Sequence, residues 1–290
     1  MRELVNEPAF VEIEEALKQS AASILSSRTT ILLLAPPTIE GALAIAPIEG
    51  ALLDSGIPYR RRFSNEEPSL DSFVWISDQV PMPKMEKSAN SPRVIISPIV
   101  VDGLRGHLGD PRKGPLTTAL QAHALAQLIA PASPRLRSMR PWALSGNWIG
   151  SALDTVYDPV FTAIRDFLEV EGSIRVVPVT EVSEPEEKNY PWLDPGVLNV
   201  VSENWPSMNI GEREQSMALL AHPTLLTNHP STPRIEELLW HCIVGNGWAS
   251  DLATNIAHAS LIWERTSQRG AAGRVVDNLL AGTKFWLLES

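Results

Sequence analysis

The sequence of 290 residues contains a single cysteine, Cys242. One thiol excludes an intramolecular disulfide and any metal site built from several thiolates. Cys242 lies in the apolar stretch EELLWHCIVGNG. We therefore expect a buried thiol rather than a reactive nucleophile, because a nucleophilic cysteine needs an accessible, electropositive setting.

Long apolar runs are also missing. The longest, near residues 30–37 and 94–101, are far shorter than the roughly 20 residues that cross a bilayer. The first residues include Glu3, Glu7 and Glu12, where a signal peptide would have basic residues followed by apolar ones. With 44% hydrophobic and 20% charged residues, the composition is that of a globular protein of one or two domains. The sequence predicts a cytoplasmic location and no membrane partner.

Positive charge is scarce, with 24 Lys and Arg against 34 Asp and Glu. Residues 1–140 hold 15 of each sign, whereas residues 141–290 hold 9 cations and 19 anions. Non-specific nucleic-acid binding by the whole chain is therefore not expected, because phosphate neutralisation needs clustered cations. Local clusters remain candidates for contact with single-stranded DNA, and the alternative for each is an ordinary solvated face. They are Arg60, Arg61 and Arg62, and the group Arg135, Arg137 and Arg140.

The first 180 residues alternate between short β-branched runs and helical spacing. Strands are expected at 29–35, 72–77, 93–97 and 174–178, and helices at 8–26, 40–55 (bent at Pro47 and capped by Gly56), 115–130, 136–150 and 159–169. This alternation is typical of an α/β fold in which a parallel sheet carries helices on both faces.

The stretch 181–210 differs in composition, being rich in Pro, Glu, Asn and Ser without sustained periodicity. We interpret it as a linker or surface excursion between an α/β domain at 1–180 and a smaller helical domain at 211–290. Helices are expected there near 211–221, 233–244, 249–266 and 272–284. Trp192 and Trp205 lie within the stretch and are hard to bury unless it docks on something, so they are candidate interface residues.

The first strand ends in a turn with few polar side chains. Residues 31–41 read ILLLAPPTIEG, a buried strand that runs into a sharp turn and a helix. α/β enzymes gather charged groups at this end of a strand. Here the turn is Ala35-Pro36-Pro37-Thr38-Ile39, so the sequence predicts the scaffold of a catalytic site without most of its reactive groups.

Three further segments follow in order: FVWIS before Asp78, RVIIS before the triplet Pro98, Ile99 and Val100, and PWALSGNWIG, which ends at Gly150. With the first turn, their order and spacing over residues 28–155 resemble the motifs of the DHH phosphoesterase family. That family includes RecJ-type exonucleases and an inactive eukaryotic relative that serves as a helicase subunit.

The resemblance places the first motif's three metal-binding positions on Pro36, Thr38 and Glu40, and its glycine on Gly41. Asp78 matches the aspartate of the second motif. Pro98, Ile99 and Val100 replace the Asp-His-His triplet that names the family, and Gly150 lies near the acidic position of the fourth motif. What the resemblance implies is a degenerate DHH fold that has lost most of its metal ligands.

The loss of these ligands decides the expected function. Two divalent cations need several carboxylates and imidazoles, and burying a cation against Pro36, Pro37, Pro98, Ile99 and Val100 would be strongly unfavourable. We therefore expect no catalytic residue and no cofactor. By resemblance to the inactive branch, the chain is expected to be a scaffold in an archaeal-type replication assembly, with GINS and the MCM helicase as implied partners.

Two alternatives remain open. A divergent phosphoesterase or exonuclease would hold Mn²⁺ or Mg²⁺ at a relocated site on Asp78, Asp102, His107 and Asp110, although the last three also fit an ordinary glycine-rich loop. A sensor would bind a small ligand or nucleotide in the apolar cleft instead.

Overall fold

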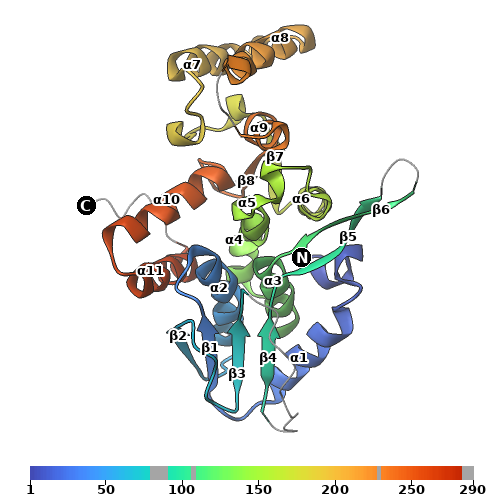
Figure 1. Cartoon of the computed structure of the whole chain (residues 1–290), viewed down its shortest axis with the longest axis vertical. Helices are drawn as coiled ribbons and strands as arrows, with labels where there is room; N and C mark the ends of the chain where they lie inside the picture. Colours follow the sequence, from blue (N-terminus) through green and yellow to red (C-terminus); the bar gives the residue numbers. More distant parts are fainter. Residues whose placement is uncertain (79–90, 106–108, 227–229, 283–290) are drawn as a thin grey trace.

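A four-stranded parallel sheet forms the centre of the first half of the chain (Figure 1). The computed structural model describes residues 1–78, 91–105, 109–226 and 230–282. The sheet consists of β1 (Ile31–Ala35), β2 (Tyr59–Phe63), β3 (Phe73–Ile76) and β4 (Arg93–Ile96) in the spatial order β2-β1-β3-β4. Each neighbouring pair is parallel, and helices flank the sheet. The predicted α/β class is therefore confirmed.

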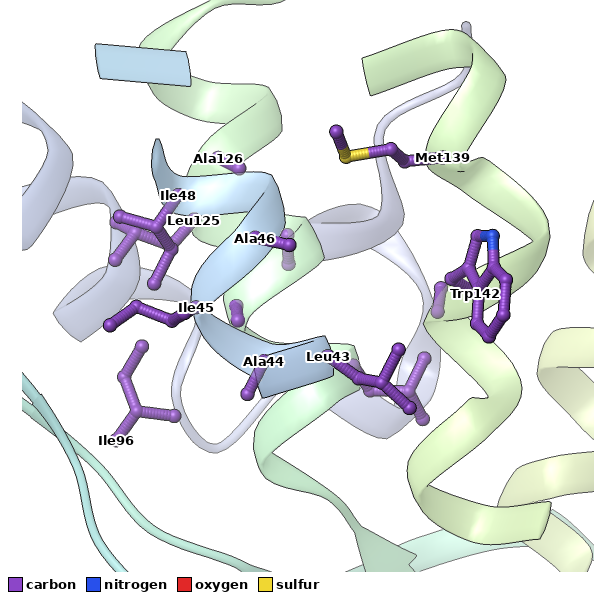
Figure 2. Close-up of a cluster of buried hydrophobic side chains, with 14 of the residues drawn as sticks. Leu43, Ala44, Ile45, Ala46, Ile48, Ile96, Leu125, Ala126, Met139 and Trp142 are labelled. Atoms are coloured by element: carbon purple, nitrogen blue, oxygen red, sulfur yellow. The ribbon is translucent and has the colours of Figure 1, made fainter. Parts of the chain in front are cut away.

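Helix α2 (Ile39–Asp54) lies at the heart of the main core. It contacts β1, β2 and β3 and packs closely against α3 (Thr118–Ile129) and α11 (Gln268–Ala281). Figure 2 shows its apolar side chains between those of α3, β4 and the segment with Met139 and Trp142. Residues 41–52 of α2 are all buried, which explains why their sequence is apolar around the whole helix. The helix continues through Pro47, and Gly56 follows it with a positive φ of 66°.

The remaining elements of the first 177 residues surround this core. They are η1 (Leu4–Asn6), η2 (Pro8–Phe10), α1 (Glu14–Ser26), α4 (Pro134–Met139), η3 (Arg140–Leu144), α5 (Ser145–Ile149), η4 (Ser151–Asp154) and α6 (Pro159–Glu171). Two further pairs of strands are antiparallel and separate from the main sheet: β5 (Ile99–Arg105) with β6 (Pro111–Leu116), and β7 (Ile174–Val177) with β8 (Cys242–Gly245).

The two faces of the parallel sheet are covered differently. One face packs against α2, α3 and α11, whereas the other carries a small cluster of Leu32, Leu34 and Phe73 with Trp75 and Ile95 partly buried against it. The β1–β2 and β2–β3 connections run in opposite directions across the sheet, so right-handed crossovers place them on opposite faces. The second connection, residues 64–72, contains no helix, although a helix was expected to cover each face.

The C-terminal half differs from the expected division into domains. Its elements are η5 (Val179–Glu181), η6 (Glu187–Asn189), α7 (Pro195–Asn204), η7 (Trp205–Ser207), α8 (Ile210–Ala221), η8 (His222–Leu226), α9 (Thr232–Leu239), α10 (Leu252–Arg265) and α11. A second hydrophobic cluster spans residues 177–253 and includes the stretch expected to be a linker. Helices α10 and α11 return to the main core, while α7 and α8 lie at the end of the molecule far from the parallel sheet (Figure 1).

Candidate functional site at the carboxyl edge of the parallel sheet

Strands β1, β3 and β4 end at one edge of the sheet. Leu34 of β1 is in register with Trp75, which is in register with Ile95, so the turns after the three strands meet there. Ligands of parallel α/β folds bind at such an edge. The strands that precede the first three motif positions therefore end at the same edge.

The turn after β1 is stabilised by contacts among its own residues. Pro36 and Pro37 are buried, and the Thr38 Oγ1 atom accepts a hydrogen bond from the Gly41 backbone nitrogen at 3.1 Å, which caps α2. A Cβ atom on Gly41 would lie 2.3 Å from the Pro36 carbonyl oxygen, so only glycine fits. Thr38 and Gly41 hold the turn, and Glu40 lies half-buried in the first turn of α2.

The turn after β3 contributes one exposed acid. Asp78 follows Ser77, whose backbone nitrogen donates to the Ile96 carbonyl oxygen at 2.9 Å and so continues the ladder with β4. Glu40 and Asp78 are thus the two carboxylates at the motif positions. Glu40 is half-buried and Asp78 is exposed, so the two do not form a buried set of metal ligands.

The segment after β4 leaves the edge instead of lining it. Pro98 and Val100 are exposed and Ile99 is half-buried, because Ile99 and Val100 already belong to β5. Pro36 and Pro37, in contrast, are buried. The expectation that these five residues form the floor of one apolar pocket is therefore wrong.

The fourth motif position is joined to the C-terminal half by a guanidinium group. Gly150 ends α5, and its carbonyl oxygen accepts a hydrogen bond from Arg234 Nη2 at 3.2 Å. Arg234 also donates to the Trp148 carbonyl oxygen at 2.7 Å and to Asp154 Oδ1 at 2.8 Å, and its guanidinium lies 4.7 Å from the centre of the Trp148 ring. The Arg234 guanidinium, a cation of the protein itself, is thus fixed beside Gly150.

Helix α10 contacts the β1 turn directly. The Trp263 Nε1 atom donates a hydrogen bond to the Pro37 carbonyl oxygen at 3.1 Å. Trp263 is half-buried and packs against the main core. Trp263 and Arg234 have no counterpart among the sequence motifs, because the motifs lie within residues 28–155.

The structure does not support a relocated metal site. Among the described residues, no three His, Cys, Asp or Glu side chains lie close enough together to hold a metal ion. Asp102 is an exposed residue of β5, and Asp110 is exposed beside β6. His107 lies outside the described residues.

The three consecutive arginines of β2 do not form one basic patch. Alternation along the strand leaves Arg60 and Arg62 exposed and turns Arg61 toward α2 and α11. Arg61 donates to Glu49 Oε2 at 3.0 Å and to Asp277 Oδ1 at 2.6 Å. We therefore keep only Arg60 and Arg62 as candidate DNA contacts.

Glu49 is the buried partner in this network. Burial raises the pKa of its carboxyl, and Arg61 acts in the opposite direction. The Tyr59 hydroxyl donates to Glu49 Oε1 at 2.9 Å, and burial together with that carboxylate raises the pKa of Tyr59 to about 12.

The second arginine group is also dispersed. Arg140 is 2% exposed and donates to Glu171, to Gln127 Oε1 and to the Arg2 carbonyl oxygen. Arg135 pairs with Asp54, and Arg137 is exposed. These side chains connect separate elements and offer no common surface for phosphates.

Trp192 and Trp205 are buried within the chain, with 8% and 3% of their surface exposed. Both belong to the second hydrophobic cluster, and Trp205 Nε1 donates to Glu181 Oε1 at 3.0 Å. The expectation that they need a partner to be buried is wrong, because the stretch 181–210 folds onto α8, α9 and β8. Cys242 is buried as expected, and burial raises the pKa of its thiol well above the ordinary value.

Comparison with known proteins identifies a similar fold. No protein-family model matches the sequence, and no curated protein matches it. The crystal structure of CDC45 from Entamoeba histolytica is similar, with a TM-score of 0.50 and 10% sequence identity over 94% of this chain and 68% of that chain. CDC45 has the RecJ/DHH-like fold. This chain therefore has a RecJ-like fold.

At 10% identity, the likeness to CDC45 concerns the fold. It agrees with the resemblance read from the motif order, and the geometry gives Thr38, Gly41 and Gly150 structural roles. No helix in the part of the chain that the structure describes has the length and apolar character of a membrane span.

Proposed function

We propose that this chain is a non-catalytic RecJ-like scaffold protein that works in a DNA replication assembly. The observation that carries the proposal is the use of the motif positions. Thr38 caps a helix, Gly41 permits a tight turn, the Gly150 carbonyl binds Arg234, and Pro98 leads into a hairpin. A fold that keeps its motif spacing while these positions serve its own stability is suited to binding rather than to metal-dependent hydrolysis.

The replication context rests on the resemblance to CDC45, a component of the replicative helicase. Under this proposal the partners are the GINS complex and, through it, the MCM helicase, and the chain acts in the cytoplasm of a cell with an archaeal-type assembly. Single-stranded DNA would contact Arg60 and Arg62, the two exposed arginines of β2.

Two measurements test the proposal. The purified full chain is expected to co-elute with the GINS complex of its own organism in size-exclusion chromatography, and with MCM only when GINS is present. The same preparation, incubated with Mn²⁺ and 5′-labelled single-stranded DNA, is expected to cleave no faster than its Asp78→Ala variant.

Each measurement has an outcome against the proposal. Cleavage at enzyme-like rates that disappears in Asp78→Ala would establish the phosphoesterase alternative, because a contaminating nuclease would remain in both preparations. Failure to bind GINS at micromolar concentrations would contradict the proposed replication assembly. It would not contradict the proposal that the edge is non-catalytic.

A further inference from the structure

The hairpin of β5 and β6 extends from the body of the molecule, as Figure 1 shows at the right of the view. Its two strands pair only with each other among the described strands, so each has one outer edge. Strand edges carry backbone N–H and C=O groups that bind another extended chain unless they are blocked. The two edges of this hairpin differ in that respect.

The outer edge of β6 is blocked by proline. Val100 is opposite Pro115, which has no N–H, and the Pro115 carbonyl oxygen accepts from Asn147 Nδ2 at 2.9 Å. Val100 and Pro115 are therefore a pair without mutual hydrogen bonds, and Pro115 faces away from β5. Residues two apart share this direction, so Pro111, Lys113 and Pro115 define the outer edge of β6, where two of three N–H groups are missing.

The outer edge of β5 carries no proline, although η2 lies against the same strand. The same alternation directs the backbone N–H and C=O groups of Val100 and Asp102 outward. In the part of the chain that the structure describes, neither residue forms a backbone hydrogen bond outside the hairpin. Val100 is 65% exposed, and Leu104, which lies within the register shift between Asp102 and Arg105, is 41% exposed.

The hairpin is held in place before any partner binds. A Cβ atom on Gly103 would lie 2.7 Å from the Pro159 carbonyl carbon, and one on Gly114 would lie 2.6 Å from Asp158 Oδ1. Both glycines thus allow the hairpin to touch the start of α6. A strand that is already ordered loses little conformational entropy when it pairs, which favours binding.

The side chains of β5 specify the kind of chain that would pair with it. Asp102 is exposed and lies opposite Lys113 in the hairpin register, and no ion pair joins its carboxylate to another described residue. Val100 precedes it by two residues on the same face of the strand. On an added strand, an opposite charge facing Asp102 and an apolar residue facing Val100 would complement this pattern.

We propose that the outer edge of β5 binds an extended segment of a partner protein as an added strand, with a basic residue facing Asp102 and an apolar residue, two positions away, facing Val100. This interaction surface goes beyond the scaffold proposal, since it lies on the hairpin and holds for whichever assembly the chain joins. Main-chain hydrogen bonds provide the affinity, and the alternate side chains provide the specificity.

The test uses the full chain and a fluorescent peptide, Gly-Ser-Val-Thr-Lys-Thr-Val-Ser-Gly, measured by fluorescence anisotropy. Val100→Pro removes one outward N–H from β5 and is expected to weaken binding about tenfold. Because Lys113 lies opposite Asp102 in the register, Lys113→Gln measures the effect of losing its charge alone. Lys113→Pro is the matched control for the lost donor, because it removes an outward N–H from the opposite edge and no donor from β5. It is expected to keep the affinity within about twofold.

Charge reversal gives a second readout that does not depend on proline. Asp102→Lys is expected to weaken the lysine peptide about fivefold and to strengthen binding of the same peptide with glutamate in place of lysine. Amide hydrogen exchange is expected to slow at Val100 and Asp102 when the lysine peptide binds. Thermal unfolding of each variant establishes that it is folded.

Three results would overturn the proposal. They are no binding of the lysine peptide at millimolar concentration, equal losses in Val100→Pro and Lys113→Pro, or binding without protection of the β5 amides. A dimer of the free chain that dissociates in Val100→Pro would show that a second copy occupies the edge, and the assigned partner would then be wrong. None of these results bears on GINS binding or DNA cleavage, so they separate this surface from the proposed function.

Discussion

The three arginines of β2 allow one prediction to be tested with controls from the same strand. Arg61→Gln removes the cation that faces the buried Glu49 carboxylate, whose side chain is 6% exposed. Arg60→Gln and Arg62→Gln make the same chemical change at exposed positions, and Arg62 pairs only with the exposed Glu66 among the described residues. We expect a large loss of stability in the first variant and less than about 0.5 kcal/mol in the other two.

The size of the loss follows from the geometry. At the 3.0 Å that separates Arg61 Nη1 from Glu49 Oε2, the attraction is about 5 kcal/mol with an effective dielectric constant of about 20. The variant can escape part of this loss by protonating Glu49. At pH 7 that costs about 3.7 kcal/mol, which is 1.36 kcal/mol for each of the roughly 2.7 pH units above the ordinary glutamate pKa of about 4.3. The Tyr59 hydroxyl and the new amide still donate hydrogen bonds, so we expect a loss of about 2–3 kcal/mol.

The loss depends on pH in a defined direction. Without Arg61, burial raises the pKa of the Glu49 carboxyl further in the folded protein. The folded variant then binds the proton more tightly than the unfolded chain does, and its stability falls as the pH rises above about 4.3. The difference between wild type and Arg61→Gln is expected to be about 1 kcal/mol at pH 5 and to grow toward pH 7.

Urea unfolding followed by circular dichroism at pH 5, 6 and 7 measures these differences. A second control removes both charges, since the double variant Glu49→Gln, Arg61→Gln leaves no buried carboxylate and is expected to recover more than half of the loss. The reasoning is refuted if Arg61→Gln costs no more than Arg60→Gln, or if its cost is the same at pH 5 and pH 7.

Three further predictions concern other buried groups. Arg140→Met is expected to cost about 3–5 kcal/mol in urea unfolding because it leaves the Glu171 carboxylate, 6% exposed, without its cation; a cost below 1 kcal/mol would contradict this. Gly41→Ala is expected to lower stability by about 3 kcal/mol, since its Cβ would overlap the Pro36 carbonyl oxygen, and an unchanged melting temperature would count against that contact. Cys242 is expected to react with a thiol reagent followed by absorbance only after denaturant unfolds the chain, because its thiol is buried and its pKa raised; rapid labelling of the native protein would show the site to be open.

Sequence patterns predicted the centre of the fold because the centre is apolar. β1, β3 and β4 are short runs of β-branched and aliphatic residues, and α2 follows β1 with a clear capping residue. The missed strand β2 reads YRRRF. Its arginines suggested a basic surface cluster. Periodicity alone did not show that Arg61 would pair with Glu49 on the preceding helix and with Asp277 on a helix distant in sequence.

The C-terminal half was harder to predict, because its contacts are long-range. Residues 233–244 have helical spacing, yet β8 begins at Cys242, where pairing with β7 overrides the local preference. Residues 181–210 look like a linker, although Tyr190, Trp192 and Trp205 provide enough aromatic surface to bury the stretch against α8 and α9. The candidate site was predictable where it depends on adjacent residues, as in the turn 36–41, and not where Arg234 and Trp263 reach it from beyond residue 230.

The prolines at 111 and 115 make the two outer edges of the β5–β6 hairpin unequal in backbone donors. A sheet extended through this hairpin grows from one side only, because the added strand meets β5 while the far side of β6 offers few donors to a further chain. A copy of this protein that is bound through β5 therefore cannot offer a full set of donors along β6 to the next copy. This asymmetry disfavours repeated hairpin-to-hairpin addition, a route by which strand edges polymerise into fibres.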